Sequence, residues 1–182
     1  MKIHNGIDKG LEKYNTNKPN KIIVHHTGGV DSNPLADTSH HTFETVYHWH
    51  KHGRNWTTIG YHFFIDKTGK ITQGRPVSMH GAHCIGENKT SIGICLAGNF
   101  DATTPTEAQI SSLRALLKKL VSDYNIPKSE IFPHRKFSNK TCYGNNLDDN
   151  WAKDLLNEDC SLSNFSTKEL FNELLARIKQ MR

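Results

Sequence analysis

The sequence has no long apolar segment. No stretch of its 182 residues approaches the roughly 18 consecutive apolar residues of a membrane-spanning helix. The first 20 residues also lack the apolar core of a secretory signal peptide, so we expect synthesis in the cytoplasm without an export signal. Internal repeats and low-complexity linkers are absent as well, which favours one domain over residues 1–182.

Cysteines are few, and their spacing does not predict a disulfide framework. The four cysteines, Cys84, Cys95, Cys142 and Cys160, form no CxxC pair, which argues against a small disulfide-stapled scaffold. A chain of this length can bury a core without such staples. Cys95 lies within an apolar run, where we expect a small buried side chain.

Charge of one sign is not concentrated anywhere. Lys and Arg number 23 and Asp and Glu 18, a formal net charge of +5 that is spread along the chain. We therefore expect no nucleic-acid partner, because a basic arm or patch would be needed for one. The unusual abundance is histidine: the 12 histidines direct attention to metal binding, since imidazole is the commonest metal ligand.

Short β-branched runs alternate with helical patterns, which predicts an α/β fold with a central mixed β-sheet flanked by helices. The predicted strands are residues 21–26, 61–66, 70–74, 91–98 and 131–134. A first helix is predicted from residue 38 or 39 to residue 52. A second is predicted to begin with Thr104 as N-cap, Pro105 at its first position and Glu107 at its third, and to end near Asn125.

The C-terminal region predicts a further amphipathic helix. A capping box at residues 166–169 precedes an apolar stripe that extends to Ile178. Basic residues near the end would allow weak contact with an anionic envelope surface, but packing on the domain is the expectation we favour.

Two groups of histidines compete as metal ligands. His48 and His52 are four residues apart, as in a zinc-binding HExxH helix, but Trp49 stands where that motif has its glutamate. Without this general base the metalloprotease interpretation fails, so we expect solvated or packing side chains here.

The second group combines a loop with a strand end. His134 leaves a predicted strand and Cys142 follows eight residues later, with Lys140 between them. Together with His25 or His26 they would supply three ligands and leave the fourth zinc position open, as in catalytic sites. Spacing alone leaves open that His134 and Cys142 are unrelated.

Four ordered blocks resemble a known family. They are KIIVHHTGG, WHKHGRNWTTIGYHFFIDKTGKI, GAHCIGENKTSIGICLAGNF and HRKFSNKTC. They resemble the zinc-dependent type 2 N-acetylmuramoyl-L-alanine amidases, which include phage endolysins and peptidoglycan recognition proteins. The resemblance extends from about residue 21 to 142. It implies the amidase fold and a catalytic core of about residues 21–146. The helical C-terminal extension of about residues 150–182 is predicted from the capping box and apolar stripe, not from the resemblance.

The resemblance also implies roles for individual residues. It places the Zn²⁺ ligands on His25, His134 and Cys142, and catalytic side chains on Tyr61 and Lys140. The expected substrate-binding residues in the groove beside the zinc are His26, Trp56, His83 and Asn88.

Two positions depart from the family pattern. Tyr143-Gly144 follows the cysteine ligand where many relatives have Pro-Gly, which leaves the path of this loop open. Cys95 stands where some recycling-type relatives have a glutamate, which places more weight on Tyr61 as a proton-transfer group.

The function implied is hydrolysis of the amide between N-acetylmuramic acid and L-alanine in peptidoglycan. We expect a monomeric phage or prophage endolysin that acts on the cell wall after release. The alternatives are a cytoplasmic amidase that recycles muropeptides and a peptidoglycan-binding protein without catalysis, although the latter usually lacks a zinc ligand.

Overall fold

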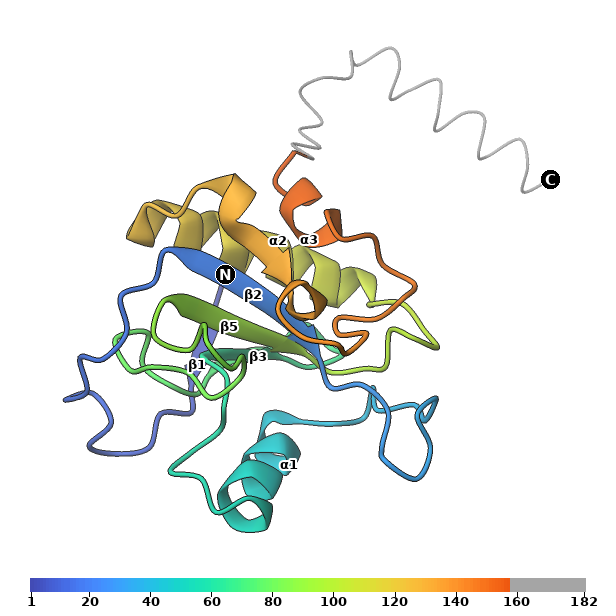
Figure 1. Ribbon diagram of the computed structural model, residues 1–182, viewed down its shortest axis with the longest axis horizontal. Helices are drawn as coiled ribbons and strands as arrows, with labels where there is room; N and C mark the ends of the chain where they lie inside the picture. Colours follow the sequence, from blue (N-terminus) through green and yellow to red (C-terminus); the bar gives the residue numbers. More distant parts are fainter. Residues whose placement is uncertain (158–182) are drawn as a thin grey trace.

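The computed structural model describes residues 1–157, which form a six-stranded mixed sheet (Figure 1). The strands are β1 (Ile3–Asn5), β2 (Lys21–His26), β3 (Phe63–Ile65), β4 (Ile71–Gln73), β5 (Ser91–Leu96) and β6 (Ile131–Pro133). Their order is β1-β4-β3-β5-β2-β6. Only β3 and β4 pair antiparallel. The predicted fold class is confirmed, and β1 is a strand that the sequence pattern did not predict.

Helices cover both faces of this sheet. The α-helices are α1 (Phe43–His48), α2 (Glu107–Tyr124) and α3 (Trp151–Asp154). A π-helical turn, Trp49–Gly53, continues α1, and short 3₁₀ turns occupy Lys128–Glu130 and His134–Lys136. Figure 1 shows α2 and α3 on one side of the sheet and α1 on the other.

Both predicted helix starts were placed too early. Helix α2 begins after Thr106, not Thr104, because the Thr106 hydroxyl accepts from the Gln109 N–H and the Gln109 side chain accepts from the Thr106 N–H, both at 3.1 Å. Helix α1 begins after Thr42. The Thr38 hydroxyl, which was expected near its start, instead donates to the Gly28 carbonyl at 2.6 Å.

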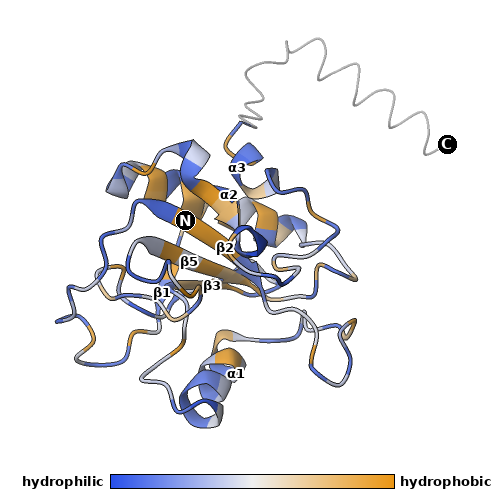
Figure 2. Cartoon of the chain, viewed as in Figure 1, coloured by the Kyte–Doolittle hydropathy of each residue, from blue (hydrophilic) through white to orange (hydrophobic). Residues whose placement is uncertain are grey.

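The alternation of side chains along the strands separates two environments. Ile22 and Val24 of β2 pack in the larger apolar cluster with the buried face of α2, whereas Cys95 of β5 packs with α1 in a smaller one. In register, His25 is the partner of Cys95, so it lies on the α1 face. In Figure 2 the strands are mostly hydrophobic and α1 is largely hydrophilic beyond its first turn. His25, the metal ligand predicted on β2, is therefore on the α1 side of the sheet.

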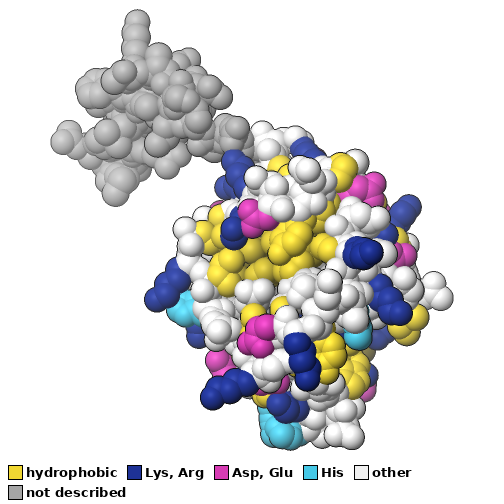
Figure 3. All heavy atoms as spheres, turned by 90° about the vertical axis from the view of Figure 1, so that its left-hand side faces the viewer, with side chains coloured by type: hydrophobic (Ala, Val, Ile, Leu, Met, Phe, Trp, Pro, Cys, Tyr) yellow, Lys and Arg dark blue, Asp and Glu magenta, His cyan; other side chains and the backbone are white. Residues whose placement is uncertain are grey.

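The surface carries charges of both signs. On the face drawn in Figure 3, Lys and Arg side chains are interspersed with Asp and Glu around an apolar area. None of the helices within residues 1–157 is long and apolar enough to cross a membrane. The helix predicted at residues 166–178, and Cys160, lie outside the described residues.

Candidate metal centre

The sheet topology brings three metal-binding side chains together. Strands β2 and β6 are adjacent and parallel, so His25 near the end of β2 and His134 immediately after β6 reach the same edge. Cys142 comes from the loop that follows. The candidate ligand atoms of these three residues all lie within 4.8 Å of one another.

Contacts among these side chains define which atoms face each other. The Cys142 Sγ lies 3.8 Å from His25 Nδ1, and the His25 and His134 ring centroids are 4.4 Å apart. His25 Nε2 points the other way and lies 3.0 Å from His83 Nδ1. The Nδ1 atom of His25 is thus the one directed at the cluster.

The backbone around Cys142 holds its sulfur against β2. The His26 N–H donates to Sγ at 3.4 Å, and the Arg135 N–H donates to the Cys142 carbonyl at 2.5 Å. The Arg135 guanidinium also donates to the carbonyls of Gly144 and Leu147 at 2.7 and 2.6 Å. Arg135, which sequence reasoning missed, therefore fixes the path of the loop that had been left open.

Protonation states at the cluster follow from burial. Burial lowers the pKa of His25 well below its usual value and also lowers that of His134, so both imidazoles are neutral at pH 7. Burial raises the pKa of the Cys142 thiol to about 12, while the hydrogen bond from His26 acts to lower it. A metal ion would have to displace this thiol proton, and binding would depend on pH.

The donor set fits zinc. Two neutral imidazoles and one thiol, all within a few ångströms, match the borderline-soft character of Zn²⁺, and three protein ligands leave one position for a water or substrate. The second ring nitrogen of His25 also has a partner, as is usual for a metal-binding histidine.

Tyr61 lies next to this cluster. Its ring centroid is 5.2 Å from that of His25, and it reaches the site from the segment just before β3. Burial raises its pKa well above the usual value, and the Cys95 and Cys142 thiols act in the same direction. Its phenol is therefore a neutral hydrogen-bond donor at pH 7.

Lys140 lies on the exposed part of the same loop, two residues before Cys142. Its positive charge contributes to lowering the pKa of His134 and acts to lower that of Cys142. The ammonium is therefore close enough to influence a negative charge that develops at the cluster.

An aromatic wall, formed by the rings of His50 and Trp56, extends from Tyr61. The His50 ring lies 5.6 Å from the Tyr61 ring and stacks on Trp56 at 4.7 Å with an interplanar angle of 13°. The Arg54 guanidinium carbon lies 5.7 Å from the Trp56 ring centroid. His50 is only 4% exposed and accepts from the Gly60 N–H, so it supports Trp56 from behind. Its helical spacing from Phe43 and Val46, which are also buried, is the sequence signal that places His50 on the inner side of the π-helical turn.

Three other predicted groove residues have hydrogen bonds within the protein. His26 is buried, and its Nδ1 accepts from the Phe100 N–H at 2.9 Å. The Asn88 side-chain oxygen accepts from the N–H groups of His83 and Cys84 at 2.9 and 3.0 Å, so it organises the loop that carries His83. The His83 ring itself contacts His25.

The helical histidine pair lies apart from this centre. His48 and His52 are exposed, with ring centroids 4.7 Å apart. Within residues 1–157, the group of three or more residues arranged to hold a metal contains neither of them. His50, between them, is the buried packing residue.

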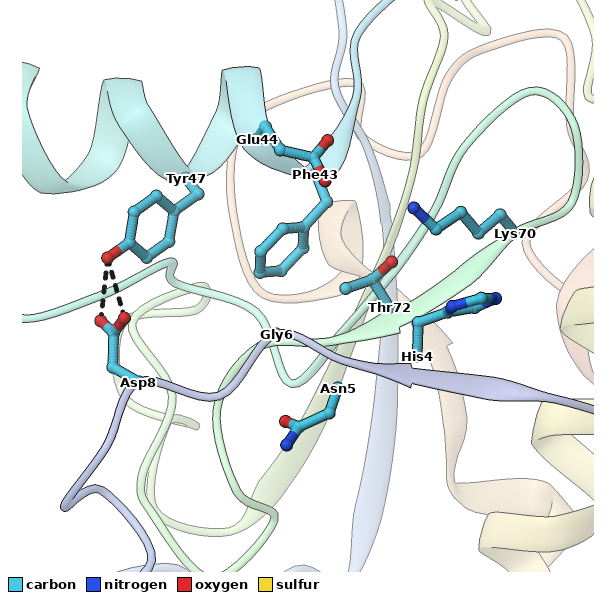
Figure 4. A pocket seen from close by; sticks show the side chains of 9 residues that line it. All are labelled: His4, Asn5, Gly6, Asp8, Phe43, Glu44, Tyr47, Lys70 and Thr72. Atoms are coloured by element: carbon cyan, nitrogen blue, oxygen red, sulfur yellow. Dashed lines mark hydrogen bonds between the residues drawn. The ribbon is translucent and has the colours of Figure 1, made fainter.

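A hollow lies between β1, β4 and α1, with side chains from all three elements (Figure 4). Its polar groups contact one another: the Tyr47 hydroxyl donates to Asp8 at 2.9 Å, and Lys51 donates to the same carboxylate at 3.0 Å. These contacts attach the N-terminal segment to α1.

Comparison with known proteins matches this chain to one family. The family model described as N-acetylmuramoyl-L-alanine amidase matches residues 15–145. The endolysin of Enterobacteria phage K11 is 37% identical over 110 residues, which cover 58% of this chain and 70% of the endolysin. Peptidoglycan-recognition protein SC2 of Drosophila melanogaster is 32% identical over 126 residues, 69% of this chain and 68% of that protein.

A solved structure agrees with the sequence match. The N-acetylmuramoyl-L-alanine amidase LysC from Clostridium intestinale URNW superimposes with a TM-score of 0.72 at 33% identity, covering 86% of this chain and 98% of LysC. The match includes the segments that carry His25, His134 and Cys142. This chain therefore belongs to the N-acetylmuramoyl-L-alanine amidase family.

Proposed function

We propose that this protein is a zinc-dependent N-acetylmuramoyl-L-alanine amidase that hydrolyses the amide between N-acetylmuramic acid and L-alanine in peptidoglycan. The observation that carries this proposal is the convergence of His25, His134 and Cys142 within 4.8 Å, in a chain of this family. All three ligand positions are filled, which favours catalysis over binding alone.

The residues around the cluster are suited to amide hydrolysis. When bound, zinc would supply a water of lowered pKa and polarise the amide carbonyl. His25, His134 and Cys142 would hold the ion. The neutral phenol of Tyr61 would hydrogen-bond the attacking water and help move its proton. Lys140 would donate to the tetrahedral oxyanion or to the leaving amine.

We place the substrate in a groove on the α1 side of the sheet, beside the aromatic wall. Trp56 would offer its ring to apolar parts of the sugar or stem peptide. His26, His83 and Asn88 would border this region, with their side chains held in place by hydrogen bonds within the protein. The catalytic core would comprise residues 21–146, with residues 150–182 as an extension of a monomer.

The physiological role we propose is that of an endolysin acting on the cell wall. The similarity to a phage endolysin at 37% identity supports it. The alternative is recycling of muropeptides. Turnover of intact sacculi should be compared with turnover of soluble anhydro-muropeptides; activity restricted to the soluble fragments would contradict the endolysin role.

The reaction itself is tested by two measurements on the purified full chain. The zinc content should be one ion per chain, and incubation with purified walls should release new amino groups that belong to N-terminal L-alanine. Binding to walls without the appearance of N-terminal L-alanine would support the alternative of a non-catalytic binding protein. Release of amino groups from another residue would exclude this amidase reaction.

A further inference from the structure

His83 was expected in the substrate groove, but its surroundings indicate a different role. Its ring lies between two glycines: a Cβ built on Gly81 would come 2.3 Å from His83 Cδ2, and one built on Gly93 would come 2.4 Å from the same atom. Gly93 is in the middle of β5, where glycine weakens a strand and often marks a close approach of another group. The two missing side chains create the slot that the imidazole fills.

A chain of hydrogen bonds gives the His83 ring one consistent tautomer. The Ser91 hydroxyl donates to the Glu87 carbonyl at 2.7 Å, so its oxygen can only accept from His83 Nε2, which lies 3.4 Å away. His83 Nε2 then carries the proton. In the neutral ring, Nδ1 is unprotonated and acts as an acceptor.

This tautomer determines the state of His25. With His83 Nδ1 as acceptor at 3.0 Å, His25 Nε2 must carry the proton and donate it. The lone pair of neutral His25 is then on Nδ1, the atom that faces Cys142 Sγ at 3.8 Å. His25 is thereby prepared for metal binding through Nδ1.

Neighbouring contacts keep the slot in place. The Gly93 N–H donates to His62 Nδ1, and His62 Nε2 donates to the Met79 carbonyl, both at 2.9 Å. The His62 and His83 rings then meet edge to face with centroids 5.7 Å apart. Strand β5 is therefore tied to the segment that precedes the His83 loop.

We infer that His83 is a positioning residue for the metal centre: it accepts the Nε2 proton of His25 and so directs the Nδ1 lone pair of His25 to the metal, with Ser91 as its own support. This inference rests on the proposed function, because it assigns His25 as a zinc ligand. It replaces the expectation that His83 binds substrate.

The first test needs no substitution and no metal. The full chain is kept metal-free with a chelator at pH 7. Its long-range ¹H–¹⁵N correlation spectra should show His25 and His83 as Nε2–H tautomers. A proton on Nδ1 of His25 would overturn the inference. Because the measurement uses metal-free protein, it is independent of whether the chain binds zinc or hydrolyses peptidoglycan.

The second test measures zinc affinity by competition with a chromophoric chelator. His83→Ala should weaken zinc binding by about 10–100-fold, as is typical when the partner of a metal-bound histidine is removed. His83→Asn, whose side-chain oxygen can replace the Nδ1 acceptor, should recover part of this loss. His48→Ala, an exposed histidine away from the cluster, is the matched control and should leave zinc affinity unchanged.

Binding of metal-free protein to purified walls separates the two roles of His83. A positioning residue predicts that His83→Ala binds walls as the unmodified chain does. Unchanged zinc affinity together with weakened wall binding would instead assign His83 to the substrate and overturn the inference. If the unmodified chain bound no zinc, the proposed function would fail. The tautomer of His25 would still show whether the hydrogen bonds from His25 through His83 to Ser91 have the inferred direction.

Discussion

The molecule contains two pairs of histidines that compete as metal ligands: one pair is close in sequence, and the other is brought together by the fold. His48 and His52 lie one helical turn apart on an exposed surface. His25 and His134 are 109 positions apart in sequence, yet their rings lie 4.4 Å from each other because β2 and β6 are parallel neighbours. The second pair has the Cys142 thiol beside His25 Nδ1, and the opposite ring nitrogen of His25 contacts His83. The comparison shows that placement by the sheet, rather than sequence spacing, creates the candidate metal centre.

Removing a ligand from the buried cluster should have the largest effect. We expect Cys142→Ala to lower zinc affinity by more than about 100-fold, beyond the usual effect of losing a residue that only supports a ligand, and to abolish wall hydrolysis. Cys84→Ala removes another buried thiol that makes no contact with the ligands, and should retain zinc. Full lytic activity and zinc content in Cys142→Ala would show that the centre is assigned to the wrong residues.

Tyr61 separates chemistry from metal binding at the same cluster. Tyr61→Phe should reduce turnover by about 100-fold, the lower range for proton-transfer groups, while zinc content stays at one ion per chain. Tyr47→Phe is the matched control, because its hydroxyl donates to Asp8 at the hollow between β1 and α1, away from the cluster. Equal turnover of Tyr61→Phe and the unmodified chain would remove Tyr61 from the mechanism.

Gly93→Ala tests whether the buried centre depends on the slot for His83. The added methyl would displace the ring, at a cost of about 1–3 kcal/mol in the free energy of unfolding, and should also weaken zinc binding. Ile94→Val, on the opposite face of the same strand, should cost about 0.5–1.5 kcal/mol with unchanged zinc affinity. Denaturant unfolding and chelator competition provide both measurements; parallel behaviour of the two variants would show that the slot has no special role.

Much of the fold was predictable because its signals are local. The β-branched runs gave five of the six strands, and the blocks around His25, Tyr61 and Cys142 indicated the site. The three-residue β1 was missed because it is short and only partly buried, and depends on pairing with β4.

The remaining features of the site depend on contacts between distant segments. The slot for His83 needs Gly81 and Gly93, and the Cys142 loop needs Arg135. None of these pairings has a periodicity or a motif of its own. The start of α2 was missed for a related reason: Thr104 and Thr106 both offer a cap, and the contact of the Thr106 hydroxyl with Lys67 is visible only in three dimensions.

Buried histidines should also make the metal-free protein sensitive to acid. Burial lowers the pKa of His62 from 6.5 to about 4, so between these values the unfolded chain binds a proton that the folded chain does not. The contribution of neutral His62 to the free energy of unfolding is therefore fully present above pH 6.5. It falls as the pH decreases toward 4, by up to about 1.4 kcal/mol per pH unit. His62→Gln, which can keep a donor and an acceptor, should reduce the slope of the unfolding free energy against pH. An unchanged slope would exclude His62 as a contributor.

The exposed pair should show the smallest effect. Replacing both His48 and His52 with alanine removes two solvent-exposed rings that belong to no three-residue ligand group within residues 1–157. We expect the free energy of unfolding to change by less than about 0.5 kcal/mol, because surface substitutions rarely exceed this and alanine favours the helix. Zinc content and wall hydrolysis should equal those of the unmodified chain. Loss of a bound zinc ion from this variant would mean that spacing on a helix is sufficient for a metal site here, and would reverse the lesson drawn from comparing the two pairs of histidines.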